Sequence, residues 1–326
     1  MGIVTYREAV NCALADALAT DDSVFFIGED VAAAGGAFKV TEGLLERFGA
    51  RRVKDAPISE QAIVGTAIGA AVGGLRPVAE LMFADFTGVC HDQIVNEMAK
   101  YRYMTGGQVA VPVTIRMACG AGNGFGAQHS QSVENWFLNV PGLKLAVPRT
   151  PADAYWLLRG AIEDDDPVLV FEHKALYNTR GELDQSVAEH AWGRAAVVRE
   201  GTDVTVVATQ LMCQRALEAA AQLDERGISL EVIDPRTVIP LDLETMTVSL
   251  QKTGRLAIVQ ESPWNGSWGA SLIAALATSS FDAFDSPPLL LAAGDSPIPY
   301  AANLEEAWMP SVARIASDIE HFLRGE

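Results

Sequence analysis

The chain has 326 residues, 49% of them hydrophobic and 20% charged, which is typical of a globular protein long enough for two domains. Its formal net charge is −18, and no cluster of Lys and Arg provides the basic face that nucleic-acid binding requires. The same acidic balance is compatible with a basic protein partner.

The cysteines and the N-terminal sequence indicate a reducing compartment. Cys12, Cys90, Cys119 and Cys213 form no C-x-x-C pair, so neither a disulfide framework nor a zinc knuckle is expected. The N-terminal stretch MGIVTYREAV has no basic and apolar signal pattern. No uncharged apolar run has the length and bulk of a membrane span. We therefore expect a cytoplasmic protein.

Apolar runs alternate with helical patterns in the first half of the chain. We expect strands at SVFFIGED (23–30), RPVAELMF (76–83), VPVTIRMAC (111–119), LKLAVP (143–148) and PVLVFEH (167–173). Helices are expected at 5–20, 59–74, 85–105 and 151–164, the last beginning with Pro after Thr150. Alternating strands and helices predict a parallel sheet with helices on both faces.

A polar stretch at 177–203 interrupts this alternation, and a second α/β pattern follows it. Its expected strands are DVTVVAT (203–209), ISLEVID (228–234), RLAIVQE (255–261) and PLLLAAG (288–294), and its expected helices are 213–226, 242–252 and 269–277. The sequence thus predicts an α/β fold with two parallel-sheet domains, at 1–185 and 203–326, joined by a linker at 186–202.

An acid precedes the most apolar of the expected helices. Glu60 stands at the start of the helix at 59–74, no formal charge follows it before Arg76, and glycines such as Gly65 and Gly69 recur. Glycines let a neighbouring backbone approach closely, in a core or at a subunit interface. The helix dipole favours an ionised acid in the first turn by about 0.3–1 kcal/mol, whereas burial requires a partner for the carboxyl group. Glu60 is therefore either a surface helix cap or a functional acid.

Alternate glycines follow the third expected strand. Gly120, Gly122, Gly124 and Gly126 lead into a loop that carries His129. The dinucleotide fingerprint G-x-G-x-x-G fits these glycines poorly, and no acid closes a following strand about 20 residues later. A loop that approaches a ligand is the better interpretation, and His129 is either a catalytic residue or a hydrogen-bonded surface residue.

Several stretches together resemble one enzyme family. They are DAPISEQAIVGTAIGAAVGGLRPVAELMFADF, DQIVNEMAKYRYMTGG, AQHSQS, PGLKLAVPRTPADA, AIEDDDPVLVFEHK and VIDPRTVIPLD. Over essentially its whole length, the chain resembles the beta subunit of the thiamine-diphosphate-dependent first component of the 2-oxo acid dehydrogenase complexes. The residues of ELMFADF, KYRYMTGG and EHK favour the acetoin dehydrogenase beta subunit within that family. The resemblance implies a transketolase-like fold, with a pyrimidine-binding domain followed by a transketolase C-terminal domain.

The resemblance implies roles for five residues. Glu60 matches the glutamate that hydrogen-bonds the aminopyrimidine N1′ of thiamine diphosphate, which favours deprotonation of the thiazolium C2. Phe86 matches the aromatic residue that packs on the aminopyrimidine, with a core phenylalanine as the alternative. Ile58 and Met82 match residues that line the same pocket, and many relatives carry Gln at the position of Met82. His129 matches the active-site histidine that assists proton transfer or acyl transfer to the lipoyl group.

The resemblance also implies two metal ions. The stretch AIEDDDP matches a potassium-binding turn of some relatives, built mainly from backbone carbonyls, and the counterparts of its ligands are Val113, Ala161, Ile162, Asp164 and Asp166. A solvated acidic helix end is the alternative. Magnesium requires hard oxygen ligands beside the phosphates, which the family holds with a Gly-Asp-Gly motif that this chain lacks. An alpha subunit is therefore expected to hold Mg²⁺ and the diphosphate in an α₂β₂ heterotetramer.

Taken with the resemblance, these residues predict a catalytic beta subunit that cleaves acetoin or a 2-oxo acid and passes the acyl unit to a lipoyl acyltransferase core. The C-terminal domain of the family docks the basic subunit-binding module of that core, and Glu305, Glu306, Asp318 and Glu320 are candidate surface charges for it. Three alternatives stay open. They are pyruvate or branched-chain 2-oxo acids as the substrate, a non-catalytic scaffold subunit, and a nicotinamide oxidoreductase that uses GAGNGFG.

Overall fold

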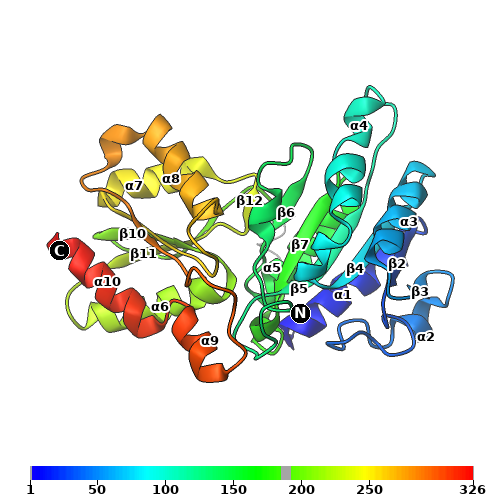
Figure 1. Cartoon of the computed structure of the whole chain (residues 1–326), viewed down its shortest axis with the longest axis horizontal. Helices are drawn as coiled ribbons and strands as arrows, with labels where there is room; N and C mark the ends of the chain where they lie inside the picture. Colours follow the sequence, from blue (N-terminus) through cyan, green and yellow to red (C-terminus); the bar gives the residue numbers. More distant parts are fainter. Residues whose placement is uncertain (1, 185–191, 326) are drawn as a thin grey trace. The chain divides into compact units, whose positions relative to one another are not determined.

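The chain folds into two compact units. A computed structural model describes residues 2–184 and 192–325, and in each unit strands and helices follow one another along the chain (Figure 1). Unit 1 contains Met1–Cys119 and Trp136–Trp192, and unit 2 contains Gly120–Asn135 and Gly193–Glu326. Each unit has its own largely parallel sheet, so the predicted α/β fold class is confirmed.

Six parallel strands form the central sheet of unit 1. In spatial order they are β6 (Lys144–Ala146), β7 (Val168–His173), β5 (Thr114–Cys119), β4 (Arg76–Phe83), β2 (Val24–Gly28) and β3 (Val53–Asp55). All residues of β2, β5 and β7 are buried, as expected for strands with helices on both faces. The carboxyl ends of these strands meet at one edge, where ligand sites of parallel sheets usually lie.

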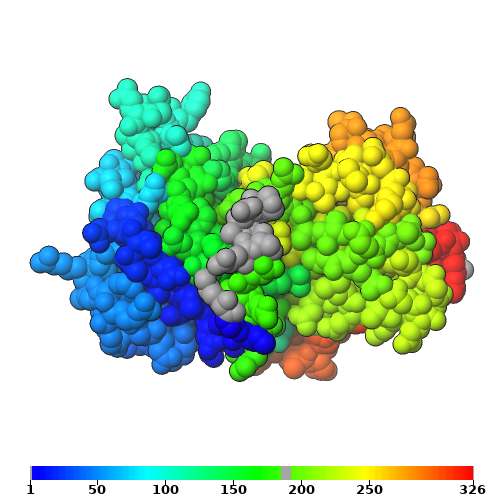
Figure 2. Space-filling model, turned by 180° about the vertical axis from the view of Figure 1, so that it is seen from behind, coloured from blue at the N-terminus to red at the C-terminus, as the bar shows by residue number. Residues whose placement is uncertain are grey.

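Capping side chains begin the two long helices of unit 1 close to their predicted starts. α1 (Tyr6–Thr20) follows Thr5, α5 (Pro151–Glu163) follows Thr150, and each threonine makes a capping box with the acid three residues later. α1 packs against α5, and Figure 2 shows the N-terminal residues, in dark blue, on the surface of unit 1. The other helical segments of this region are α2 (Leu44–Phe48), α3 (Glu60–Val72) and η4 (Lys174–Leu176).

The single helix expected at 85–105 is wrong, because three short segments form there instead. They are η1 (Ala84–Gly88), η2 (Gln93–Met98) and α4 (Tyr101–Met104). Gly88, a poor helix former, ends the first segment. The second segment is a wide π-turn, in which the amide of Ala99 donates to the carbonyl of Ile94 five residues earlier. A turn at Ala99 and Lys100 then separates this segment from α4.

A five-stranded sheet forms the centre of unit 2. In spatial order its strands are β14 (Leu289–Leu291), β13 (Leu256–Val259), β10 (Val204–Ala208), β11 (Leu230–Asp234) and β9 (Ala196–Arg199). The first four are parallel, and β9 joins β11 in the antiparallel direction. β9 lies within the stretch 186–202 that was expected to be a linker, of which residues 186–191 fall outside the described part of the chain.

The polar stretch after residue 176 also contributes to a small sheet of unit 1, in which β8 (Arg180–Glu182) pairs with β1 (Ile3–Thr5). The helices of unit 2 are α6 (Gln210–Asp224), α7 (Leu243–Thr253), α8 (Trp268–Ser279), α9 (Ala302–Trp308) and α10 (Val312–Arg324). Short segments complete the fold, namely β12 (Thr237–Ile239), η3 (Glu134–Phe137) and η6 (Phe281–Ala283). Among the described residues, no helix is both long enough and apolar enough to cross a membrane.

Candidate active site

Glu60 is the first residue of α3, at the carboxyl edge of the unit 1 sheet. β3 ends at this edge with Asp55, and the loop after it leads into α3. Glu60 is only 7% exposed, although Ser59, the residue before the helix, makes no capping hydrogen bond. The acid therefore faces the positive end of the helix dipole with little water to screen its charge.

Glu29 is a second acid at this site, and it was not predicted from the sequence. It directly follows β2, it is 7% exposed, and its Oε1 atom is buried without a hydrogen-bond partner among the described residues. Burial, followed by the charges of Glu60 and Asp30, raises the pKa of Glu29. The effect of Glu60 shows that the two acids are neighbours. The position of Glu29 directly after a parallel strand is the signal that would have identified it.

Cys90 lies in the same neighbourhood as a neutral thiol. It is buried, and its Sγ atom is 3.8 Å from the carbonyl oxygen of Phe86. Burial, and then the charge of Glu60, raises the pKa of Cys90 to about 12. Cys90 is therefore protonated and a poor nucleophile at neutral pH. None of the four cysteines, all within the described residues, is part of a disulfide.

The remaining residues of the predicted pocket differ in exposure. Phe86, on η1, is half-buried and packs edge-to-face on Phe83, with ring centres 5.5 Å apart. Met82, also half-buried, lies where the register of β4 against β5 shifts, and such irregularities re-aim side chains next to active sites. Ile58 is 85% exposed. A pocket that Ile58 lines therefore has to be completed by another molecule.

His129 belongs to unit 2, whereas Glu60 belongs to unit 1. The loop that carries it, Gly120–Asn135, is tied to unit 2 at both ends. Glu261 accepts hydrogen bonds from the amide of Ala121 at 2.6 Å and from Ser132 Oγ at 3.3 Å. Near the end of the loop, the side chain of Asn135 donates to Ser262 Oγ and accepts from the amide of Trp268, both at 2.8 Å.

Glu134, near the end of the same loop, is a further buried acid that the sequence did not reveal. It is 4% exposed, and its Oε2 atom has no hydrogen-bond partner among the described residues. Burial raises the pKa of Glu134 to about 7, and the nearby charge of Glu261 adds to the increase. This loop therefore combines a histidine with an acid that titrates close to neutral pH.

The four candidate surface charges of unit 2 are not all on the surface. Glu305 is 2% exposed, so its prediction as a docking charge is wrong, because its carboxylate is turned into the protein. The other three pair with arginines, namely Glu306 with Arg215, Asp318 with Arg314, and Glu320 with Arg226 and Arg324. Their negative charge is partly neutralised within the chain itself.

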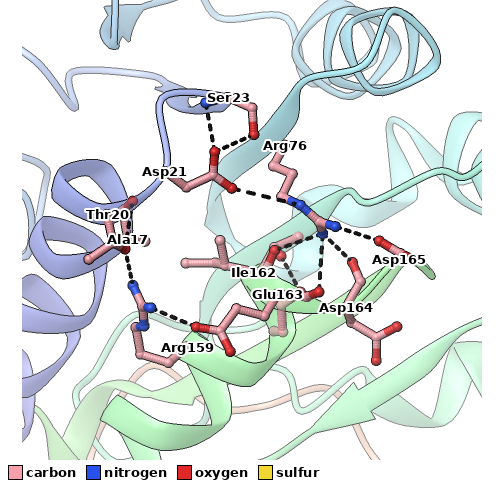
Figure 3. Close-up of polar contacts among 12 residues, drawn as sticks. Ala17, Thr20, Asp21, Ser23, Arg76, Arg159, Ile162, Glu163, Asp164 and Asp165 are labelled. Atoms are coloured by element: carbon pink, nitrogen blue, oxygen red, sulfur yellow. Dashed lines mark hydrogen bonds and ion pairs between the residues drawn. The ribbon is translucent and has the colours of Figure 1, made fainter.

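The turn predicted to bind potassium is occupied by an arginine side chain. Figure 3 shows Arg76, from β4, directed at the end of α5. Its Nη1 atom donates to the carbonyl oxygens of Ile162 and Glu163, both at 3.2 Å, and of Asp164 at 3.0 Å. Arg76 also forms an ion pair with Asp165. A guanidinium at the last carbonyls of a helix caps it and complements its dipole.

The other predicted potassium ligands also have partners within unit 1. The carbonyl oxygens of Val113 and Ala161 each accept a hydrogen bond at 3.0 Å. The carboxylate of Asp164 accepts from Lys144 Nζ at 2.8 and 2.6 Å, and Asp166 lies 3.4 Å from the same nitrogen. Asp166 also pairs with Arg102. Among the described residues, Arg76, Lys144 and Arg102 thus place three cationic groups on this turn, and a potassium ion there would have to share its oxygens with them. Potassium binding stays a prediction.

Comparison with known proteins adds the family. Residues 3–180 match the domain described as "Transketolase, pyrimidine binding domain", and residues 193–315 match "Transketolase, C-terminal domain". A solved structure named "Split gene transketolase, inactive beta4 tetramer" has the same fold, with a TM-score of 0.81 and 23% identity over 99% of both chains. The two domain matches, over most of the chain, define a transketolase-like chain of the thiamine-diphosphate-dependent class.

Three relatives identify the family more closely, and each is named as a beta subunit. "Acetoin:2,6-dichlorophenolindophenol oxidoreductase subunit beta" of Bacillus subtilis is 45% identical over 97% of this chain and 96% of its own length. "3-methyl-2-oxobutanoate dehydrogenase subunit beta" of Mycobacterium tuberculosis is 44% identical, covering 98% and 92%. "Pyruvate dehydrogenase E1 component subunit beta" of Rhizobium meliloti is 42% identical, covering 98% and 70%. The chain belongs to the family of beta subunits of acetoin and 2-oxo acid dehydrogenases.

Proposed function

We propose that this chain is the catalytic beta subunit of a thiamine-diphosphate-dependent enzyme that cleaves acetoin or a 2-oxo acid. It acts with an alpha subunit in an α₂β₂ heterotetramer, and the acyl unit passes to the lipoyl groups of an acyltransferase core. The names of the relatives support this class of reaction. The observation that carries the proposal is the buried acid pair Glu60 and Glu29 at the carboxyl edge of unit 1.

The acid pair fits the aminopyrimidine ring of the cofactor. The Oε1 atom of Glu29 is buried without a hydrogen-bond partner among the described residues, and Glu60 is buried beside it. Burial and the charge of Glu60 both disfavour the ionised form of Glu29, so this carboxyl group gains from a proton or from a donor group. An aminopyrimidine has a ring nitrogen that can share a proton and an amino group that can donate one.

Each predicted residue is assigned a role in binding this ring or in the reaction. When bound, thiamine diphosphate supplies the carbanion chemistry of the reaction. Glu60 would hold the proton at N1′, and Phe86 would pack on the ring face. Met82 and Ile58 would line the pocket and exclude water from it. His129 would move a proton during cleavage or assist acyl transfer to the lipoyl group.

The diphosphate and Mg²⁺ are proposed to lie on the alpha subunit, because this sequence has no Gly-Asp-Gly. The outer face of α3 supports a partner there. Gly65 and Gly69 are exposed, and a Cβ added at either would meet no described atom within 4 Å outside the helix itself. Each glycine costs a helix interior about 1 kcal/mol relative to alanine. A closely packed partner chain would explain why both positions are glycine, because glycine lets another backbone approach closely.

Acetoin is the first substrate to test, and pyruvate and 3-methyl-2-oxobutanoate are the alternatives that the other relatives suggest. Turnover of each compound by the assembled alpha and beta subunits, with an artificial electron acceptor, decides between them. The subsequent transfer to lipoyl groups is measured with the acyltransferase core added. A cytoplasmic location also stays part of the proposal.

The acid Glu60 provides the central test. In the assembled enzyme, Glu60→Gln is expected to lower turnover by about 10²-fold or more, because an amide cannot exchange the proton that a general acid–base needs. Glu163→Gln, at an exposed glutamate on α5, is the matched control and should be fully active. Gel filtration should show both variants in the same assembly. Full activity of Glu60→Gln would instead favour the scaffold subunit, and turnover by the beta chain alone would contradict a shared site.

A further inference from the structure

The glycine loop of unit 2 has the backbone of an anion-binding site. Gly120, Gly122, Gly124 and Gly126 all have positive φ, between 71° and 93°, whereas the residues between them do not. Alternating left-handed and ordinary residues turn successive amides toward one side, which forms a concave nest for negative charge. Only glycine adopts these angles without strain.

The carboxylate of Glu305 fills this nest. Its Oε1 atom accepts the amide of Gly122 and its Oε2 atom accepts the amide of Gly124, both at 2.9 Å. Glu305 comes from α9, 183 and 181 residues away in the sequence, and is 2% exposed. A buried carboxylate that accepts one amide on each oxygen makes short, charge-assisted hydrogen bonds with a defined direction.

The contact explains why the loop resembles a phosphate-binding sequence without being one. In dinucleotide-binding folds, backbone amides of a glycine-rich turn bind the pyrophosphate. Here the anion that two of these amides bind is a side chain of the same unit. The nicotinamide alternative therefore loses the amides on which it depended.

We propose that Glu305 is a positioning residue for His129. Glu305 holds the middle of the loop through Gly122 and Gly124, and the next residues along the chain lead to His129, whose amide is 3.5 Å from the Gly126 carbonyl. Glu261 accepts from Ala121 and Ser132, on either side of this middle part. The inference deepens the proposed function and rests on it for the role of His129.

The first test measures the loop itself and requires no activity. Amide hydrogen exchange at Gly122 and Gly124 in the full chain should become about tenfold faster or more in Glu305→Gln, because the amide group offers one acceptor where the carboxylate offers two. Glu306→Gln is the matched control, since this neighbour on α9 pairs with Arg215 at the surface. If Glu305→Gln does not fold, Gly124→Ala tests the same contact from the loop side, because its φ of +71° strains any other residue. Unchanged exchange overturns the proposal.

The second test asks whether Glu305 affects turnover through His129. In the assembled enzyme, Glu305→Gln should lower turnover by about 10-fold to 100-fold, as expected for a displaced catalytic group. Glu225→Gln, at an exposed glutamate of the same unit, should not. In the background of His129→Ala, Glu305→Gln should cause almost no further loss. Losses that multiply, or full activity of His129→Ala, overturn the positioning role. If the unmodified assembly turns over none of the substrates, the proposed function fails, and the exchange result alone decides whether Glu305 holds the loop.

Discussion

Glu29, Glu60 and Glu134 are acids with little access to water. A carboxylate loses its hydration on burial, so each needs a hydrogen-bond donor, a cation or a proton in place of water. Glu29 and Glu134 each have a buried oxygen without a partner among the described residues, and burial raises the pKa of both. At the scale of residues, burial therefore favours the protonated form of Glu29 and Glu134, and a carboxyl group that can hold a proton is what acid–base chemistry requires.

Glu134 makes the stability of the chain depend on pH. Burial raises its pKa from 4.5 to about 7, so between these values the folded chain binds a proton that the unfolded chain releases. Stability from this group is present below pH 4.5 and is lost as the pH rises toward about 7. Glu134→Gln should therefore match the unmodified chain at about pH 4 and be more stable at about pH 8, on the order of 1.4 kcal/mol for each pKa unit.

Urea unfolding of the isolated chain at both pH values measures this difference. Glu225→Gln, at an exposed glutamate of the same unit, is the control. A Glu134→Gln chain that gains no stability at pH 8 would show that the carboxyl group is not held in an apolar environment.

At the scale of elements, the chemistry lies where strands end and helices begin. Glu29 follows β2, Phe86 follows β4 and Glu60 begins α3, so the parallel direction of the sheet brings these ends to one edge. The strands that support this edge are linked by a buried arginine. Arg116 of β5 is 2% exposed and pairs with Glu80 of β4 and Glu172 of β7.

Removing that arginine tests how far the sheet depends on it. Arg116→Met leaves two buried carboxylates without their cation and should destabilise the isolated chain by about 3–5 kcal/mol. Arg102→Met, which breaks a half-exposed pair with Asp166, should cost far less stability, because solvent screens an exposed ion pair. Denaturant midpoints compare the two variants. Equal losses would mean that Arg116 contributes no more than a surface ion pair.

At the scale of the whole molecule, α3 has one face that the chain does not cover. Its inner face buries Ile63, Val64 and Ala67, whereas Gly65 and Gly69 on the outer face are exposed. The sequence shows a helix with almost no charge, yet within this chain only half of it is packed. The exposed half fits a contact with a second chain, as the proposed heterotetramer requires.

Gly69→Leu separates folding from assembly. In the isolated chain the variant should melt no lower than the unmodified protein, because leucine is the better helix former by about 0.8–1 kcal/mol and a Cβ at this position meets no described atom outside the helix. With the alpha subunit present, the new side chain should prevent close approach and weaken assembly strongly. Glu218→Leu on α6, an exposed residue of unit 2, is the control. Gel filtration that shows equal assembly of both variants would exclude a close contact at α3.

Much of this architecture could be read from local patterns. The strand at 76–83 has the predicted limits, and the helices after Thr5 and Thr150 begin near the predicted residues, because apolar periodicity and caps act over a few neighbouring residues. Glu60 was recognisable for the same reason, as an acid at the start of a helix. The helix expected at 85–105 is wrong, because three short segments form there, one of which ends at Gly88 and one of which is a π-turn.

The partners of the functional groups could not be read in this way. Glu29 lies beside Glu60, Arg116 lies between two strand neighbours, and Glu305 binds glycines from 183 residues earlier. Each of these contacts is created when distant strands and helices come together, so no local pattern encodes it. The sequence alone was enough for most of the elements and for the family. Only the three-dimensional fold decides which group each buried charge contacts. The loss of water around a charge and its pairing with another charge depend on distance in space and not on separation along the chain.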